Sequence, residues 1–267
     1  MIDMKEQILQ KLTAECPWRD TLYWYSTIDS TNTRAKTLAK EGAPHGTVLI
    51  AGHQSGGRGR MGRTFVSEEG LGVYLSVILR PNCEPASLMH LTCAAGVAMM
   101  EAIKAVSGIT PQVKWINDLV VGTKKLGGIL TEMSVEKGLV DYAIIGIGIN
   151  CLQKEGDFPS VIAELATSLS LSAGRTIPTD ALAAAMIEAL WKMDQRLFSE
   201  KTQIMADYRA NCITIGKDIQ VIRGDLVRPG KAYDLDEDGG LWVEYPDGQR
   251  QCVASGEVSV RGMYGYL

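Results

Sequence analysis

The sequence contains few histidines and phenylalanines, and none of its cysteines form closely spaced pairs. Its 267 residues include three histidines (His45, His53 and His90), three phenylalanines and six scattered cysteines. No two cysteines have the Cys-x-x-Cys spacing of a metal or redox site, and the histidines form no group with metal-ligand spacing. We therefore expect no structural zinc site, and a chain of this length does not need disulfides.

A membrane span and a secretion signal are also missing from the pattern. No apolar run reaches membrane-spanning length, and residues 1–6 lack the basic-then-apolar form of a signal peptide. The chain is 46% hydrophobic and 22% charged, with a net charge of -4, which argues against a surface that coats nucleic acid. We expect a cytoplasmic protein that binds neither membrane nor DNA.

One stretch stands out against this ordinary background. Residues 56–63, called the Gly/Arg loop below, hold four glycines and the arginines Arg58, Arg60 and Arg63, with no acid among them. Glycine lets the backbone approach a ligand closely, and arginine presents a planar fork that matches phosphate or carboxylate oxygens. We predict a loop that closes over an anionic small molecule; the alternative is a solvated basic turn.

Residues 57–62 also match Gly-x-Gly-x-x-Gly, the pattern of a dinucleotide site. That site requires a helix directly after the glycines, because the helix N-terminus binds the pyrophosphate. Residues 64–79 instead contain a turn and then a predicted strand. A Rossmann site is therefore rejected, and a Walker loop is rejected because Gly-Lys-Ser/Thr is missing.

Hydrophobic patterning predicts a mixed α/β region, residues 1–212, followed by a small β-barrel, residues 213–267. In the first region we expect strands at 22–28, 47–51, 73–79, 112–116, 119–121, 128–133 and 139–149, and helices at 5–15, 34–41, 88–106, 161–171, 179–198 and 203–210. In the second we expect short strands at 219–222, 231–235, 241–245, 250–254 and 258–260.

Three further stretches are compatible with an anion site. Asn117 and Asp118 end an apolar strand, although Asn-Asp also begins many ordinary turns. Lys125 enters a strand that quickly becomes apolar, although a solvated turn lysine would look the same. Gly146 and Gly148 interrupt a strand where something approaches closely, and that neighbour is either a ligand or a packed helix.

Six motifs occur in one order from about residue 22 to the end of the chain. They are Ser30-Thr31-Asn32, Gln54 with Gly57-Arg58-Gly59-Arg60-Met61-Gly62-Arg63, Lys114-Trp115-Ile116-Asn117-Asp118, Lys125-Leu126-Gly127-Gly128-Ile129-Leu130, Gly146-Ile147-Gly148-Ile149-Asn150, and Ser255-Gly256-Glu257-Val258-Ser259. Together they resemble biotin protein ligase, also called biotin–[acetyl-CoA-carboxylase] ligase, in its short form without an N-terminal DNA-binding domain.

The resemblance implies a fold and a reaction. The fold would be a mixed-sheet, class II synthetase-like catalytic domain with a C-terminal SH3-like barrel. Biotin and ATP, with Mg²⁺, would form biotinyl-5′-AMP, and a lysine of a biotin carboxyl carrier domain would then accept the biotin. Because biotin's own carboxylate attacks, the protein needs cations that stabilise charge, not a nucleophile.

The resemblance also implies roles for individual residues. Lys125 and Arg60 would be catalytic, and Asp118 would face Mg²⁺ carried by ATP. The biotin-binding residues would be Ser30, Thr31, Asn32, Gln54, Gly57, Arg58, Gly59, Arg60, Lys125, Gly127 and Gly148. The nucleotide-binding residues would be Arg58, Arg60, Arg63, Phe65, Asn117, Asp118, Asn150 and Arg261.

Two residues depart from the family pattern, which usually has proline at Ile116 and tryptophan at Phe65. We expect Ile116 to loosen the turn beside Asn117, and Phe65 to cover the adenylate without an indole donor. About 20 residues precede the first predicted strand, fewer than a winged helix-turn-helix needs, so we expect no operator binding.

Two other functions fit parts of the pattern. A lipoate–protein ligase shares the adenylate chemistry, but its Arg-Arg…Gly-Gly-Gly…His-Asp arrangement is not found, and lipoate has no ureido group for Thr31 and Gln54 to bind. A non-catalytic nucleotide- or biotin-binding module would not need the lysine and extra arginines. Monomer and homodimer are equally compatible with the sequence.

Overall fold

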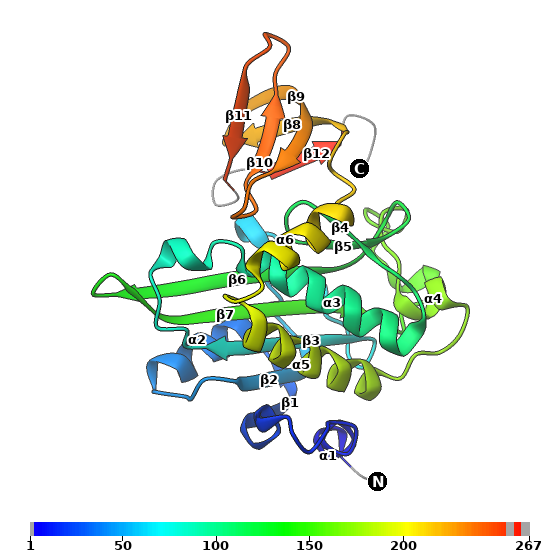
Figure 1. Ribbon diagram of the computed structural model, residues 1–267. Coiled ribbons are helices and arrows are strands. Elements are labelled where there is room, and N and C mark those ends of the chain that lie inside the picture. Colours follow the sequence, from blue (N-terminus) through cyan, green and yellow to red (C-terminus); the bar gives the residue numbers. More distant parts are fainter. Residues whose placement is uncertain (1–2, 255–258, 263–267) are drawn as a thin grey trace.

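The computed structural model describes residues 3–254 and 259–262, which form a large mixed sheet and a smaller antiparallel sheet (Figure 1). The large sheet has the order β1-β2-β3-β7-β6-β5-β4. Only β1 and β2 run parallel, and every other neighbouring pair is antiparallel. The strands are β1 (Leu22–Ile28), β2 (Thr47–Gln54), β3 (Gly72–Leu79), β4 (Gln112–Lys114), β5 (Asp118–Val121), β6 (Lys124–Glu136) and β7 (Leu139–Asn150). The expected mixed α/β fold is confirmed.

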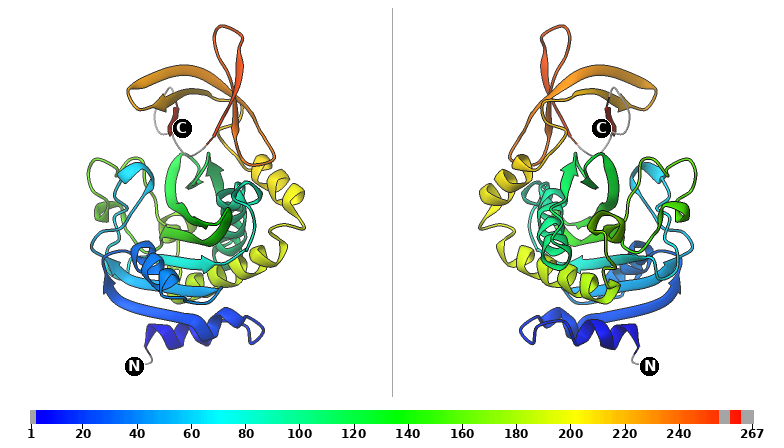
Figure 2. Two further views of the ribbon diagram at one scale, coloured as in Figure 1. Left: turned by 90° about the vertical axis from the view of Figure 1, so that its left-hand side faces the viewer. Right: turned by 90° about the vertical axis from the view of Figure 1, so that its right-hand side faces the viewer.

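Helices cover both faces of this sheet (Figures 1 and 2). Helices α3 and α5 pack together on one face, against β6 and β3, and α2 packs on the other face, against β2, β3 and β7. The helices are α1 (Met4–Leu9), α2 (Thr31–Lys40), α3 (Leu91–Ser107), α4 (Leu169–Ala173), α5 (Thr179–Arg196) and α6 (Lys201–Ala210). The central strand β3 is buried at all eight positions because both of its faces are covered.

Strand alternation separates two cores of unequal size. On β7, Ile145, Ile147 and Ile149 face the large core beneath α3 and α5, whereas Ile144 faces a small core beneath α2. The α2 side also carries Gly146 and Gly148, which lack side chains of their own and line a cavity on this face. The sheet therefore has one tightly packed face and one face with room for a site.

The segment Pro85–Ser107 corrects one expectation from the sequence. It is long and apolar enough to cross a membrane by length and composition, but 78% of its apolar window is buried within the fold. Helix α3 makes up most of this segment and packs against β6, α5 and α6. Its apolar character is thus explained by its central position in the core.

The second sheet has the order β11-β10-β9-β8-β12 and is antiparallel throughout, which confirms the expected small all-β domain. Its strands are β8 (Asp218–Arg223), β9 (Leu226–Leu235), β10 (Leu241–Glu244), β11 (Arg250–Val253) and β12 (Ser259–Gly262). It contacts the larger unit directly: Trp115 Nε1 donates to the Gly239 carbonyl at 2.8 Å, and Arg209 pairs with Asp234 at 2.8 Å. The boundary between residues 212 and 213 stays a prediction.

Several predicted elements differ from the observed ones. The helix expected at 161–171 is wrong: only α4 forms there, capped by the Ser168 hydroxyl. The preceding residues leave the helical path because Lys125 N donates to the Leu165 carbonyl at 2.7 Å and Thr167 N donates to the Lys125 carbonyl at 2.9 Å. The first helix ends at Leu9 instead of 15, α2 begins at Thr31 instead of 34, and β4 ends at Lys114 instead of 116.

Candidate active site

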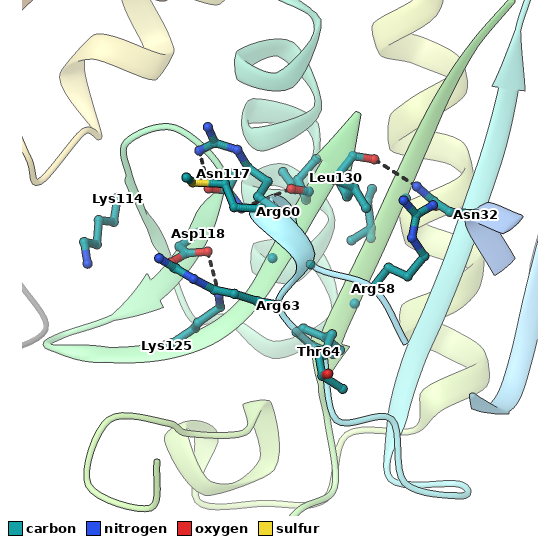
Figure 3. Close-up of a pocket in the computed structure, with 18 of the residues that line it drawn as sticks. Asn32, Arg58, Arg60, Arg63, Thr64, Lys114, Asn117, Asp118, Lys125 and Leu130 are labelled. Atoms are coloured by element: carbon teal, nitrogen blue, oxygen red, sulfur yellow. Dashed lines mark hydrogen bonds and ion pairs between the residues drawn. The ribbon is translucent and has the colours of Figure 1, made fainter. Parts of the chain in front are cut away.

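A cavity of about 570 Å³ opens on the α2 side of the large sheet, between the start of α2, strands β6 and β7, and the Gly/Arg loop. Most of the predicted site residues line it, although the sequence separates them by more than 100 positions. They are Ser30, Thr31, Asn32, Gln54, Arg58, Gly59, Arg60, Arg63, Phe65, Asn117, Asp118, Lys125 and Gly148. Figure 3 shows the three arginines on the loop, near Asn117 in the turn between β4 and β5, Asp118 on β5 and Lys125 on β6.

One wall of the cavity is a hydrogen-bonded set of hydroxyl and carboxamide groups. The backbone N–H and the hydroxyl of Thr31 both donate to Gln54 Oε1, at 2.8 and 3.1 Å. Ser76, fully buried behind this wall, lies 2.8 Å from the Thr31 hydroxyl and 2.6 Å from Asn32 Oδ1. Such a wall offers both donors and acceptors to a ligand, as recognition of a ureido group requires.

The opposite end of the cavity is cationic. Lys125 Nζ donates to Asp118 Oδ1 at 2.6 Å, and the two side chains are 31% and 17% exposed. Residues 165–167 pair with the backbone of Lys125, which fixes where its side chain begins. The cation is therefore held at the pocket without being withdrawn from solvent, and it is available to an incoming carboxylate or phosphate.

The Gly/Arg loop is anchored to neighbouring elements. Arg58 forms two hydrogen bonds with Glu132 of β6, at 3.2 and 3.1 Å, and Arg60 donates to Asn117 Oδ1 at 3.2 Å. Burial lowers the pKa of Arg60, although the nearby Asp118 charge opposes this shift. The loop itself contains no acid, and Glu132 of β6 supplies a carboxylate for Arg58 from another element.

Three predicted residues, Gly57, Gly127 and Asn150, do not line the cavity in the part of the chain that the structure describes. Gly57 lies against the Phe65 carbonyl and Ser67, and Gly127 lies against the Gly148 carbonyl and Ile149, so these glycines permit close packing of the protein itself. Asn150 is buried, and its Nδ2 donates to the Thr167 carbonyl at 3.1 Å. Arg261 lies on β12, and its side chain is outside the described residues.

Glycines on the sheet face the protein's own side chains. A Cβ at Gly148 would come within 2.5 Å of the Phe65 ring, and one at Gly146 would collide with the Asn32 carboxamide. The close neighbour at Gly146 is thus a helix residue, as the packing alternative had it. At Gly148 it is the aromatic ring that covers the cavity.

Residues overlooked by the sequence reasoning support these groups from behind. Glu132 holds Arg58 and Asn32, Ser76 holds Thr31 and Asn32, and Ile162 and Leu165 form an apolar part of the lining. Glu132 could have been found from the sequence, because alternate residues of a strand lie on one face, and Glu132 shares that face with Gly128 and Leu130. Ser76 could also have been found, because it is the single serine in a strand of otherwise apolar and aromatic side chains.

The turn that carries Asn117 is held by contacts instead of a proline ring. Tyr208 donates its hydroxyl to the Ile116 carbonyl at 2.9 Å, and Trp115 N donates to Thr214 Oγ1 at 2.9 Å. Ile116 is itself buried, and the Trp115–Ile116 peptide bond is cis. The expected loosening beside Asn117 stays a prediction.

The donor set bears on the predicted magnesium. Among residues 3–254 and 259–262, no group of three or more His, Cys, Asp or Glu side chains is placed to hold a metal ion. Asp118 offers a single carboxylate, already bonded to Lys125. This set fits a Mg²⁺ ion held mainly by nucleotide phosphates and its own waters, which is how such ions usually bind.

Comparison with known proteins first shows the class of protein to which the chain is similar. A model of the Biotin/lipoate A/B protein ligase family matches residues 24–150, which include most of the residues that line the cavity. A model of the biotin protein ligase C terminal domain matches residues 214–261, which include nearly all of the second sheet.

Individual relatives narrow the class. The chain is 36% identical over 235 residues to the bifunctional ligase/repressor BirA of Bacillus subtilis, covering 88% of this chain and 72% of that protein. It is 32% identical over 236 residues to the biotin–[acetyl-CoA-carboxylase] ligase of Mycobacterium tuberculosis, covering 86% and 85%. The solved biotin protein ligase from Aquifex aeolicus in complex with biotin and ATP superposes with a TM-score of 0.76 at 28% identity, covering 91% of this chain and 99% of that chain. The chain belongs to the biotin protein ligase family.

Proposed function

We propose that this protein activates biotin with ATP and transfers it to a lysine of a biotin carboxyl carrier domain. In the first step a biotin carboxylate oxygen forms a bond to the α-phosphorus of ATP, and the bond to the β-phosphate oxygen breaks, releasing pyrophosphate. In the second, the acceptor lysine nitrogen bonds to the acyl carbon, AMP leaves with the anhydride oxygen, and the amine loses a proton.

The observation that carries this proposal is the pairing of two different surfaces in one cavity. The Thr31–Gln54 wall suits a neutral head group with N–H and C=O groups, and the Lys125 end suits the carboxylate at the other end of the same molecule. Arginines of the loop lie between them and over them. A molecule with a ureido head and a carboxylate tail matches both ends at once.

Each charged residue has a defined task in this scheme. Lys125 attracts the carboxylate and the α-phosphate, two anions that otherwise repel each other, and stabilises the charge that builds on the phosphate. Arg60 and Arg63 lie on the loop beside Asn117 and Asp118 and are suited to cover the same phosphate. Mg²⁺ bound to ATP supplies further neutralisation of phosphate charge.

Lipoate is the second candidate substrate, since the matched family includes lipoate ligases. Its dithiolane ring has no hydrogen-bonding groups, so it would leave the Thr31–Gln54 wall without a ligand partner inside the cavity. A site built to hydrogen-bond a ligand group favours a substrate that carries that group over one that lacks it. The wall therefore favours biotin.

The test is transfer of label to a carrier domain in the presence of ATP and Mg²⁺. The protein is incubated with labelled biotin and a biotin carboxyl carrier domain, and with labelled lipoate and a lipoyl domain in parallel. We expect one biotin per carrier domain, at its acceptor lysine, and no transfer of lipoate. Transfer of lipoate without transfer of biotin would overturn the proposal.

A further inference from the structure

Glu132 lies behind the cavity at a junction of three elements. From β6 its carboxylate accepts hydrogen bonds from Asn32 Nδ2 at 3.0 Å, from Lys36 Nζ at 2.6 Å, and from both terminal nitrogens of Arg58. Asn32 and Lys36 belong to α2, and Arg58 belongs to the Gly/Arg loop. One carboxylate therefore connects the pocket wall, the sheet and the loop.

The Asn32 carboxamide is held in a single orientation. Its Nδ2 faces two groups that only accept, the Leu130 carbonyl and the Glu132 carboxylate. Its Oδ1 must then face a donor, which is the Ser76 hydroxyl at 2.6 Å. The Ser76 hydroxyl also contacts the Thr31 hydroxyl at 2.8 Å, which links the Asn32 carboxamide to Thr31.

The same chain of contacts continues to the other end of the loop. Thr31 contacts Gln54 Oε1, and Gln54 Nε2 donates to Ser67 Oγ at 2.9 Å. Ser67 in turn donates to the Phe65 carbonyl at 3.1 Å. A continuous path of hydrogen bonds thus begins at Arg58, crosses the pocket wall, and ends at Phe65, just after the loop.

We propose that Glu132 is a positioning residue that ties the Gly/Arg loop to the pocket wall and so sets how long the acyl-adenylate is retained. Glu132 does not line the cavity, so it acts through Arg58 and Asn32. Loss of its charge releases Arg58 and removes the acceptor that orients Asn32. The loop then opens more often, and the wall that binds the ligand head is less well ordered.

The proposal rests on the function proposed above, and the experiment separates the two. Enzyme loaded with labelled biotin and ATP is freed of excess ligand, and the dissociation of adenylate is followed after a chase. For Glu132→Gln we expect an increase of about three- to tenfold in the dissociation rate constant and in the biotin KM, since the Arg58–Glu132 pair is only partly buried. The change in kcat should be smaller.

A matched control lies on the same strand. Glu136 is exposed and pairs only with Lys137, at 3.6 Å, among the described ion pairs, so Glu136→Gln should retain the adenylate as the parent does. A double-mutant cycle adds a second criterion. If Glu132 acts through Arg58, then Arg58→Met combined with Glu132→Gln should release the adenylate no faster than the more severe single variant.

Two results would overturn the positioning role. One is a Glu132→Gln variant that retains the adenylate like the parent, and the other is a double variant whose effects simply multiply. If the parent itself forms no biotinyl adenylate, the proposed function fails instead. A measured melting temperature for each variant excludes general unfolding as the cause of a faster release.

Discussion

Replacement of Arg60 by glycine removes the cation that anchors the middle of the Gly/Arg loop. Arg60 donates to Asn117 Oδ1 at 3.2 Å and is partly buried. A hydrogen bond to a charged group contributes about 1.5–3 kcal/mol, which corresponds to about 10- to 150-fold in a rate or equilibrium constant. Because Lys125 is untouched, Arg60→Gly should still form the adenylate but release it faster by a factor in this range.

Escape of the adenylate has a chemical consequence that can be measured. A released acyl-adenylate acylates nearby lysines without selection, so the variant should label bystander proteins and itself in the presence of biotin and ATP. The assay counts biotin on an unrelated lysine-rich protein and on the carrier domain. Arg60→Ala serves as the control for the extra backbone freedom of glycine, and it should behave similarly. If both variants retain the adenylate as the parent does, the loop is closed by other residues.

Three further predictions follow from the same contacts. Lys125→Ala should lower the rate of adenylate formation by at least about 100-fold, measured as pyrophosphate release in the absence of a carrier domain, because it removes the electrostatic partner of both anions; a normal rate would refute its catalytic role. Gly146→Ala should destabilise the fold by about 1–3 kcal/mol and raise the biotin KM, because its Cβ collides with Asn32; thermal unfolding and initial rates check this. Burial raises the pKa of Glu132, but the hydrogen bonds of Lys36 and Asn32 outweigh it and lower the pKa overall from the ordinary 4.5. Its stabilising contribution should therefore be complete above pH 4.5 and be lost as the pH falls through the lower, folded-state pKa, so the stability gap between the parent and Glu132→Gln should close on acidification; a gap that persists would contradict this.

The sequence predicted the strands of the large sheet well because their patterns are strong. β3 is apolar at nearly every position, as a strand covered on both faces must be, and the Gly-Ile alternation at 146–149 reflects one packed face and one open face. Most of the site residues that the resemblance implied line one cavity, whereas residues 255–258 of the last motif lie outside the described part of the chain. What assembled them was the antiparallel pairing of β3, β7 and β6, which no short motif encodes.

The helix that was wrongly predicted at 161–171 shows that tertiary contacts can override a local helical pattern. Val161, Ile162, Leu165 and Leu169 are spaced as on a helix face, yet Val161 is 83% exposed. Backbone hydrogen bonds join residues 165–167 to Lys125 in an isolated β-bridge, and Ile162 and Leu165 line the cavity. The partner strand lies 40 residues away in sequence, so a helical window could not contain it.

The contacts that support the cavity residues from behind could not be predicted from local sequence patterns either. The link from Arg58 to Glu132 spans 74 residues, and that from Ser76 to Asn32 spans 44. Each joins residues whose local patterns read as ordinary: a charged residue late in a strand, and a serine among apolar neighbours. The role of each became visible only when the strand register placed it behind the cavity.

The most direct test of the account identifies the molecule that the protein holds after one turnover. The protein is mixed with biotin, lipoate, ATP and Mg²⁺ without any carrier domain, separated from free ligand and denatured, and the released compounds are identified by mass. The account predicts close to one biotinyl-5′-AMP per chain for the parent and none for Lys125→Ala. Recovery of lipoyl-AMP, or of no acyl-adenylate from the parent, would contradict it.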